Sequence, residues 1–237
     1  MKTLDDLAAD FGLDQTQAAA LSRYLDLLLG WRRGNITAVR TRAEAVERLL
    51  ADSLALLGVP ALEEAGPRWL DLGSGAGIPG IPLAVGRPCV HITLLESVAN
   101  KCAFLEAAVI AAGLVERARV VHARSEGFAA PASESREAFD LVVVRAVAGL
   151  ASVVELAAPL LALGGVLLAV KSLEGAAREG GAAQAAAGRC GLAAAGTTPL
   201  SRSPLRDSVC AVFVKTGPTP DWLPRRAGLA TRKPLAP

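Results

Sequence analysis

The chain has 237 residues, of which 52% are hydrophobic and 20% charged, and its formal net charge is +2 at pH 7. This size and composition predict a globular protein with a substantial core and exclude a disordered chain. Asp5 and Asp6 come too early for a signal peptide, and Pro159 and Gly164-Gly165 interrupt the most apolar segment. We therefore expect a cytoplasmic protein with no membrane partner.

The sequence offers little for metal binding. Its four cysteines lie far apart with no C-x-x-C pair, and it has only two histidines. Zinc sites and disulfide frameworks rest on closely spaced or regularly spaced ligands, which are missing from this pattern. We expect reduced thiols and no metal.

Residues 3–62 carry a helical pattern. Apolar residues recur at spacings of three and four, and no strand signal interrupts them. The pattern breaks at residues 30–37, and a further helix is expected over residues 42–57, where Gly58 ends it. Residues 1–64 are thus expected to form a helical N-terminal cap, too small to be a separate catalytic domain.

Strand and helix signals alternate after Pro67, with short connections between them. This order predicts an α/β fold with a mostly parallel sheet covered on both faces. The expected strands are residues 68–72, 90–96, 118–122, 139–145 and 166–171, and the expected helices are residues 100–112 and 150–161.

The last third of the chain predicts an edge and a tail. Residues 174–190 predict a helix that breaks at Gly180-Gly181. Two β-like runs, residues 192–199 and 207–215, predict an antiparallel, hairpin-like edge that closes a domain of residues 65–216. Prolines and basic residues then predict a basic, extended tail over residues 217–237.

A glycine-rich turn follows the first expected strand, in the segment Asp71-Leu-Gly73-Ser-Gly75-Ala-Gly77-Ile-Pro-Gly80. Alternating glycines allow positive φ or close approach to the backbone, and Pro79 can open a helix. At the carboxyl end of a strand, such a turn predicts a nucleotide-like ligand. Glu96, at the end of the second expected strand, is placed to accept hydrogen bonds from ribose hydroxyls.

Two observations favour S-adenosylmethionine over a dinucleotide. Counted from Gly73, the dinucleotide fingerprint requires glycine where Ile78 stands, and only the shifted set from Gly75 to Gly80 fits. A dehydrogenase also needs a proton donor beyond the turn, whereas the only tyrosine, Tyr24, lies in the cap. The cofactor residues predicted from the pattern are Asp71, Gly73, Gly75, Gly77 and Glu96.

Several segments together resemble one family, the RsmG or glucose-inhibited division protein B (GidB) family of bacterial ribosomal RNA methyltransferases. The segments are Asn35-Ile-Thr-Ala-Val-Arg40, Arg48-x-x-x-Asp52-Ser53, residues 70–83, Leu94–Ser97 with Asn100-Lys101, and Arg145-Ala146. The resemblance implies a Rossmann-like S-adenosylmethionine-dependent fold. It also implies methyl transfer to N7 of a guanine in 16S ribosomal RNA, within the small ribosomal subunit.

The resemblance also implies roles for individual residues. Gly73 and Ile78 match cofactor-contacting positions, Ser125 and Glu126 match a pair near the adenine, and Arg145 matches a residue between cofactor and substrate. The positions expected to meet RNA are Asn35, Arg40, Lys101 and Lys171.

The sequence departs from the family pattern at two positions. Leu49 stands where members commonly have His, and Ser208-Val209 replaces an Arg-His pair, with Arg206 as the nearest basic residue. Because guanine N7 carries a lone pair and no proton, the chemistry needs alignment rather than a general base. A methyltransferase with another substrate, a non-catalytic nucleotide-binding regulatory module and an NAD-linked oxidoreductase remain the alternatives.

Overall fold

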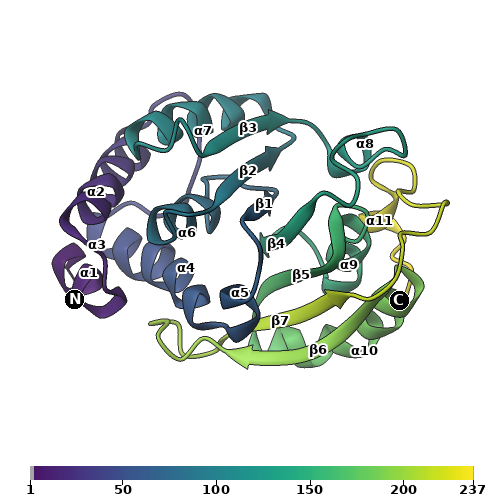
Figure 1. Ribbon diagram of the computed structural model, residues 1–237. Helices are drawn as coiled ribbons and strands as arrows, with labels where there is room; N and C mark the ends of the chain where they lie inside the picture. Colours follow the sequence, from purple (N-terminus) through teal and green to yellow (C-terminus); the bar gives the residue numbers. More distant parts are fainter. Residues whose placement is uncertain (1–2, 237) are drawn as a thin grey trace.

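The computed structural model describes residues 3–236, in which a seven-stranded sheet lies between two layers of helices (Figure 1). The strand order is β3-β2-β1-β4-β5-β7-β6; β1 to β5 are parallel, and β7 is antiparallel to both of its neighbours. The predicted Rossmann-like fold with an antiparallel edge is confirmed. The strands are β1 (Arg68–Leu72), β2 (His91–Glu96), β3 (Ala118–His122), β4 (Phe139–Arg145), β5 (Leu161–Ser172), β6 (Leu192–Pro199) and β7 (Ser208–Lys215).

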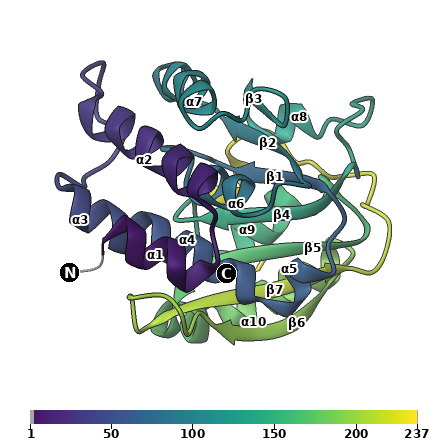
Figure 2. The same cartoon turned by 60° about the vertical axis from the view of Figure 1, so that its left-hand side comes forward.

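Helices cover both faces of the sheet, and Figure 2 shows α1 and α2 in front of α4 and α6 on one of them. The first layer holds α1 (Leu4–Phe11), α2 (Gln15–Gly30), α3 (Arg42–Ala45), a π-helical turn (Val46–Ala51), α4 (Asp52–Leu54), a 3-10 turn (Ala55–Gly58), α5 (Pro60–Glu63), α6 (Gly80–Gly86) and α7 (Ala99–Ala111). The second layer holds α8 (Ser125–Phe128), α9 (Leu150–Ala157), α10 (Leu173–Arg189) and α11 (Leu229–Arg232).

The cap helices share one core with the sheet. Leu7 of α1 and Tyr24 of α2 are fully buried in the same cluster as Trp69 of β1. Residues 42–58 run as continuous helical turns, close to the predicted helix. The division into residues 1–64, 65–216 and 217–237 stays a prediction, and residues 1–2 and 237 lie outside the described residues.

Alternation along the strands decides where each predicted site residue points. The core under the first layer contains Trp69 of β1 and Val143 of β4. Asp71 and Arg145, each two residues further along, therefore point to that layer. Lys171 of β5 points to the second layer, where it contacts α10. The side chains of Arg145 and Lys171 thus leave the carboxyl edge of the sheet on opposite faces.

Two predicted helices are corrected. The helix after β5 does not break at Gly180-Gly181, because its alanines are strong helix formers and one alanine face is buried in the second core. The helix expected over residues 150–161 ends at Ala157, just before Pro159, which cannot continue the hydrogen-bond ladder.

The predicted tail is not simply extended. It folds back onto the second helix layer and forms the short helix α11. Leu223 is buried in the second core, and Arg225 makes a bidentate ion pair with Glu155 of α9, at 2.6 and 2.5 Å. Glu155 is 3% exposed, so Arg225 neutralises a buried charge. Proline and basic content did not reveal these anchors.

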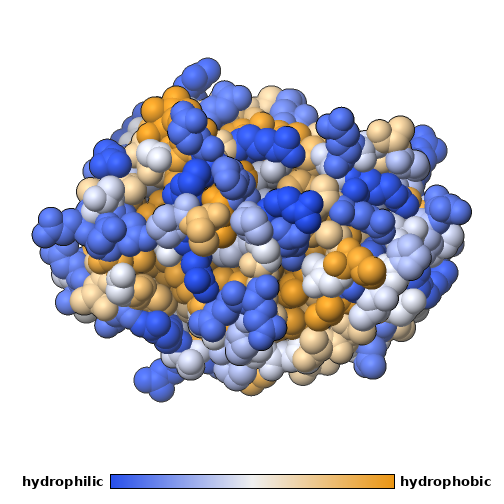
Figure 3. Space-filling view, viewed as in Figure 1, coloured by the Kyte–Doolittle hydropathy of each residue, from blue (hydrophilic) through white to orange (hydrophobic). Residues whose placement is uncertain are grey.

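Figure 3 shows hydrophilic residues spread over the whole of one face, with smaller apolar areas between them. None of the helices over residues 3–236 is long and apolar enough to cross a membrane. In the same part of the chain, no group of three or more His, Cys, Asp or Glu side chains is arranged to hold a metal ion.

Candidate functional site

The site lies at the carboxyl ends of β1 and β4, where the chain changes direction across the sheet. From β1 the strand order runs outward through β2 and β3, and from β4 it runs outward on the other side. Loops leaving two such strands diverge and leave a crevice in which ligands of open α/β sheets bind. The glycine turn follows β1, and Arg145 ends β4.

All three alternating glycines of the turn have positive φ, with values of 74° at Gly73, 56° at Gly75 and 80° at Gly77. The space beside them differs. A Cβ on Gly73 would meet Val147 at 2.6 Å, and one on Gly77 would meet Ile81 at 2.4 Å. On Gly75, a Cβ would meet only a backbone oxygen, at 3.8 Å. Gly75 is therefore the position where the bare backbone is open to a ligand.

Asp71 lies beneath the turn. It is fully buried, its Oδ2 accepts a hydrogen bond from Gly80 N at 3.0 Å, and its Oδ1 has no hydrogen-bond partner among the described residues. Gly77 and Ile78 also face the first core. These three predicted cofactor residues shape the turn from below, and a contact between their side chains and a cofactor stays a prediction.

Burial raises the pKa of Asp71 from 3.8 to about 7; the hydrogen bonds from Gly80 and Ser74 oppose the rise, and the nearby Glu96 carboxylate adds to it. The folded state therefore keeps a proton that the unfolded chain releases, and the chain loses stability as pH rises from about 4 through about 7. Asp71→Asn keeps an acceptor for Gly80 and removes this titration. We expect the difference in melting temperature, variant minus wild type, to become more positive as pH rises from about 5 to about 8. A constant difference in thermal unfolding between these pH values would contradict the assignment.

Glu96 fixes the outer side of the turn. Its Oε2 accepts from Gly75 N at 3.0 Å, and its Oε1 accepts from the backbone N–H groups of Ser97 and Val98 at 2.7 and 2.9 Å. The carboxylate thus joins the end of β2 to the most open residue of the turn. A carboxylate has about four acceptor sites, so one remains for a ribose hydroxyl.

A cavity of about 140 Å³, here called the nucleoside cavity, opens beside the turn. Its lining combines apolar side chains with backbone and carboxylate polar groups, the mixture that is typical of small-molecule sites. The described lining residues are Leu72, Gly73, Leu95, Ser97, Ala123, Arg124, Ser125, Glu126, Val147, Leu156, Gly228 and Thr231. The structure therefore brings together Gly73, Ser125 and Glu126, which the sequence predicts near the cofactor.

Arg145 reaches the first helix layer and pairs with Asp52 of α4. Its Nη2 donates to the carbonyl of Arg48 at 2.9 Å, and its Nη1 lies 3.2 Å from Asp52 Oδ2. The Nη1 contact is close enough for an ion pair but not aligned for a hydrogen bond, so Nη1 is a buried donor with no hydrogen-bond partner among the described residues.

Asp52 is a site residue that the role assignments from sequence missed. It is 1% exposed, and its Oδ1 accepts from Ser203 and Ser208 at 2.7 and 2.8 Å. It joins the cap, β4 and the loop between β6 and β7. Its place in the Arg48-x-x-x-Asp52-Ser53 segment was the only signal. Ser208, where the family pattern has a basic residue, takes part by donating to Asp52.

A larger hollow of about 590 Å³, here called the substrate hollow, lies on the other side of the β4 end. Asp52, Arg145, Lys171 and Arg206 line it, together with neighbouring backbone. The Lys171 ammonium donates to the Ala148 carbonyl at 2.8 Å and to Glu179 at 2.9 Å. These bonds use two of its three donors and brace the loop after β4.

Glu179 holds the same loop from α10. Its Oε2 also accepts from Leu150 N at 2.7 Å, at the start of α9. Burial alone would raise the pKa of Glu179, but the hydrogen bonds from Lys171 and Leu150 hold it below the ordinary value. Lys171 and Glu179 form an ion pair, and this pair holds residues 146–149 in place.

The remaining residues expected to meet RNA lie where the loop after α2 approaches α7. A Cβ on Gly34 would meet the Asn100 side chain at 2.4 Å, which shows how closely the two segments approach. The loop carries exposed Asn35 and Arg40, and Lys101 is half-buried on the first turn of α7. Asn35 and Arg40 line a separate hollow of about 210 Å³ within this loop. None of the three residues lines the nucleoside cavity or the hollow beside Arg145.

Tyr24 ties the cap to the turn, an arrangement that its position in the sequence did not suggest. Its hydroxyl donates to the Ala76 carbonyl at 2.7 Å. Burial, with a contribution from the Asp71 carboxylate, raises the pKa of Tyr24 far above its ordinary value. The hydroxyl therefore acts as a structural donor, and a proton-donor role in hydride transfer does not fit it.

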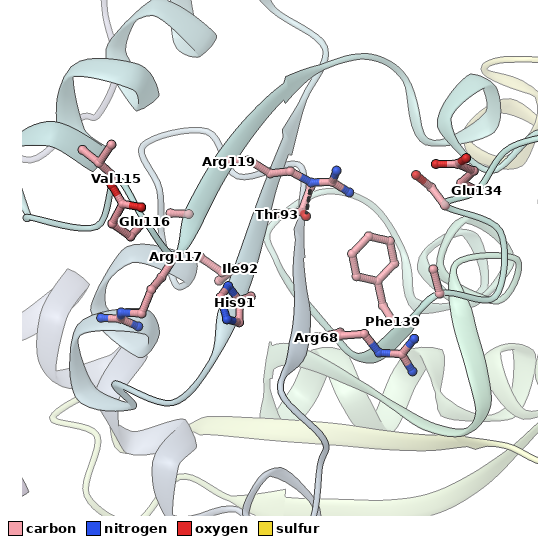
Figure 4. Close-up of a pocket in the computed structure, with 13 residues that line it drawn as sticks. Arg68, His91, Ile92, Thr93, Val115, Glu116, Arg117, Arg119, Glu134 and Phe139 are labelled. Atoms are coloured by element: carbon pink, nitrogen blue, oxygen red, sulfur yellow. Dashed lines mark hydrogen bonds between the residues drawn. The ribbon is translucent and has the colours of Figure 1, made fainter.

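A further hollow, of about 430 Å³, lies at the amino ends of β1 to β4, on the opposite edge from the turn (Figure 4). Figure 4 shows Arg119 and Glu134 approaching it from opposite sides, with Arg119 bonded to Thr93 at 2.9 Å. Arg68 is paired with Asp140 at 2.6 Å. Ligands of this fold bind at the other edge, so this hollow is not the candidate site.

Comparison with known proteins agrees with this geometry. Residues 17–189 match the family model GidB, described as rRNA small subunit methyltransferase G. This chain belongs to that family. The matched residues contain the glycine turn, both members of the Arg145 and Asp52 pair, and the Lys171 and Glu179 pair.

Two relatives match the chain over nearly its whole length. Both are named ribosomal RNA small subunit methyltransferase G. The one from Chloroflexus aggregans is 37% identical and aligns with 94% of this chain and 92% of its own. The one from Roseiflexus castenholzii is 36% identical, over 99% of this chain and 100% of its own.

Solved structures support the fold. The cofactor-bound protein Rv0187 from MTB aligns with a TM-score of 0.54 at 19% identity, covering 92% of this chain and all of its own. An O-methyltransferase from neocarzinostatin biosynthesis, solved in complex with S-adenosylmethionine, aligns with a TM-score of 0.51 at 18% identity, covering 69% of this chain and 55% of its own.

Proposed function

We propose that this chain transfers a methyl group from S-adenosylmethionine to N7 of a guanine in 16S ribosomal RNA. Beyond the family, one observation carries the proposal. The nucleoside cavity and the substrate hollow meet at residues 145–147, because Val147 lines the first while Arg145 and Ala146 line the second. A donor and an acceptor bound on the two sides would face each other across the end of β4.

The cofactor would be held by residues of the glycine turn and of the nucleoside cavity. Gly75 offers open backbone, Glu96 keeps an acceptor site for ribose hydroxyls, and Ser125 and Glu126 form the wall beyond the end of β3. When bound, S-adenosylmethionine supplies a sulfonium methyl group to a nucleophile.

The residues of the substrate hollow orient and stabilise rather than remove a proton. Guanine N7 is a lone-pair nucleophile, so no general base is needed. The partly exposed Arg145 side chain lines this hollow and would donate to guanine O6, a contact that would leave the N7 lone pair free. Asp52 and the Arg48 carbonyl hold the guanidinium in place before the base arrives.

RNA would be held around the mouth of the site by Asn35, Arg40 and Lys101, with the exposed Arg206 beside the substrate hollow. Because the N7 edge faces the deep, narrow groove of A-form RNA, the target base would lie in a loop, bulge or opened region. We propose the small ribosomal subunit as the partner and the cytoplasm as the location. The proposed methyl transfer involves no metal and no membrane.

Methylation assays test the proposal directly. We expect the purified chain to transfer labelled methyl from S-adenosylmethionine to 16S ribosomal RNA, either free or assembled in small subunits, and to lose activity as salt rises. Mapping N7-methylguanine in RNA from cells with and without the gene should show one such site disappear. Transfer to another substrate, or an unchanged N7-methylguanine map, would reject the guanine assignment. Binding of NAD without S-adenosylmethionine would reject the cofactor.

A further inference from the structure

The C-terminal segment reaches the nucleoside cavity from the far end of the chain. Gly228 and Thr231 belong to its described lining, although the other lining residues come from residues 72–156. The tail passes close to α8 (Figure 1), and Gly228 N donates to Glu126 Oε1 at 2.7 Å. The carboxylate predicted near the adenine is thus held by the tail.

The tail is fixed on both sides of Gly228. Before it, Arg225 makes the buried ion pair with Glu155. After it, Ser152 of α9 donates to the Ala230 carbonyl at 2.9 Å, and Ala230 is 2% exposed. A segment anchored at both ends by α9 keeps the N–H between them directed at Glu126. The hydrogen bond is therefore part of a built contact rather than a chance approach of a loose end.

We infer that residues 228–231 form one wall of the cofactor site, and that Gly228 is a positioning residue that holds Glu126 for the nucleoside end of S-adenosylmethionine. The inference rests on the proposed location of the cofactor in the nucleoside cavity. Gly228 has a φ of 76°, a conformation that glycine adopts without strain. Glycine at this position therefore lets the backbone N–H point at Glu126 without backbone strain. Cofactor binding and tail docking must then favour each other by the same factor.

Two substitutions test whether the tail is part of the cofactor site or only packs on the surface of the protein. Thr231→Trp puts a large side chain into the nucleoside cavity, and Arg226→Trp puts the same side chain on an exposed tail residue outside the cavity lining. We expect Thr231→Trp to raise the Kd and KM for S-adenosylmethionine by about tenfold or more. The KM for RNA should stay unchanged, and Arg226→Trp should bind the cofactor like wild type.

Limited trypsin digestion measures the coupling in the unaltered chain. Arg226 and Arg232 are exposed tail residues, and Arg202 in the loop between β6 and β7 serves as the internal reference. We expect S-adenosylmethionine to slow cleavage after Arg226 and Arg232 relative to cleavage after Arg202. Wild-type cofactor affinity in Thr231→Trp, or tail cleavage that ignores the cofactor, would overturn the inference and leave the proposed function standing. A wild-type chain that does not bind S-adenosylmethionine would overturn both.

Discussion

Gly75→Val is expected to abolish measurable binding of S-adenosylmethionine while the chain remains folded. The added side chain enters the open space beside the turn, where a Cβ meets no side chain of the protein. A ligand that approaches the bare backbone there is excluded. We expect the Kd, measured by calorimetry, to rise at least about 100-fold, which corresponds to about 2.7 kcal/mol.

A second glycine separates exclusion from backbone strain. Gly164 also has a positive φ, 78°, with nothing within 4 Å of its Cβ position, and it lies in β5 away from the turn. Valine at either position costs about 1–3 kcal/mol of stability because β-branched residues are strained at positive φ. Gly164→Val should therefore melt like Gly75→Val and bind S-adenosylmethionine like wild type. Equal loss of affinity in both variants would trace the effect to strain.

The elements that the sequence predicts best carry their signal locally. β1, β3 and β4 begin and end where expected. β1 and β4 are short apolar runs that form buried strands in the parallel sheet, whereas β3 is a partly exposed strand at its edge. The glycine turn was predicted equally well, because its alternating glycines are a local signal. The helix α10 was less so, since burial of its alanine face outweighed the Gly180-Gly181 pair.

The contacts that organise the site join residues far apart in the chain, and the sequence did not predict them. Asp52 meets Arg145 of β4, and Glu126 meets Gly228. No spacing rule links such positions, because the partners come together only when the sheet has formed. Alternation along β4 does predict that Arg145 points to the cap, but it does not predict which side chain of the cap pairs with Arg145.

Arg145→Ala is expected to lower methyl transfer about 100-fold or more, since it removes a preorganised donor from the substrate hollow. It should also cost about 2 kcal/mol of stability by leaving the Asp52 carboxylate buried without its cation, less than the ~3–5 kcal/mol of a fully buried pair. Arg145 is 20% exposed and Asp52 1% exposed, which places the pair between the two limits. Stability and activity therefore both fall in the single variant, and the single variant alone does not separate them.

The double variant Asp52→Asn with Arg145→Ala makes the separation. A neutral amide retains an acceptor for Ser203 and Ser208 and removes the uncompensated charge. Denaturant unfolding should show most of the lost stability restored, while methyl transfer stays about 100-fold down because the guanidinium is still missing. Arg145→Lys adds a charge-preserving control, with a compact ammonium that cannot reproduce the fork between the Arg48 carbonyl and Asp52. Recovery of activity along with stability in the double variant would show that Arg145 serves only to neutralise Asp52.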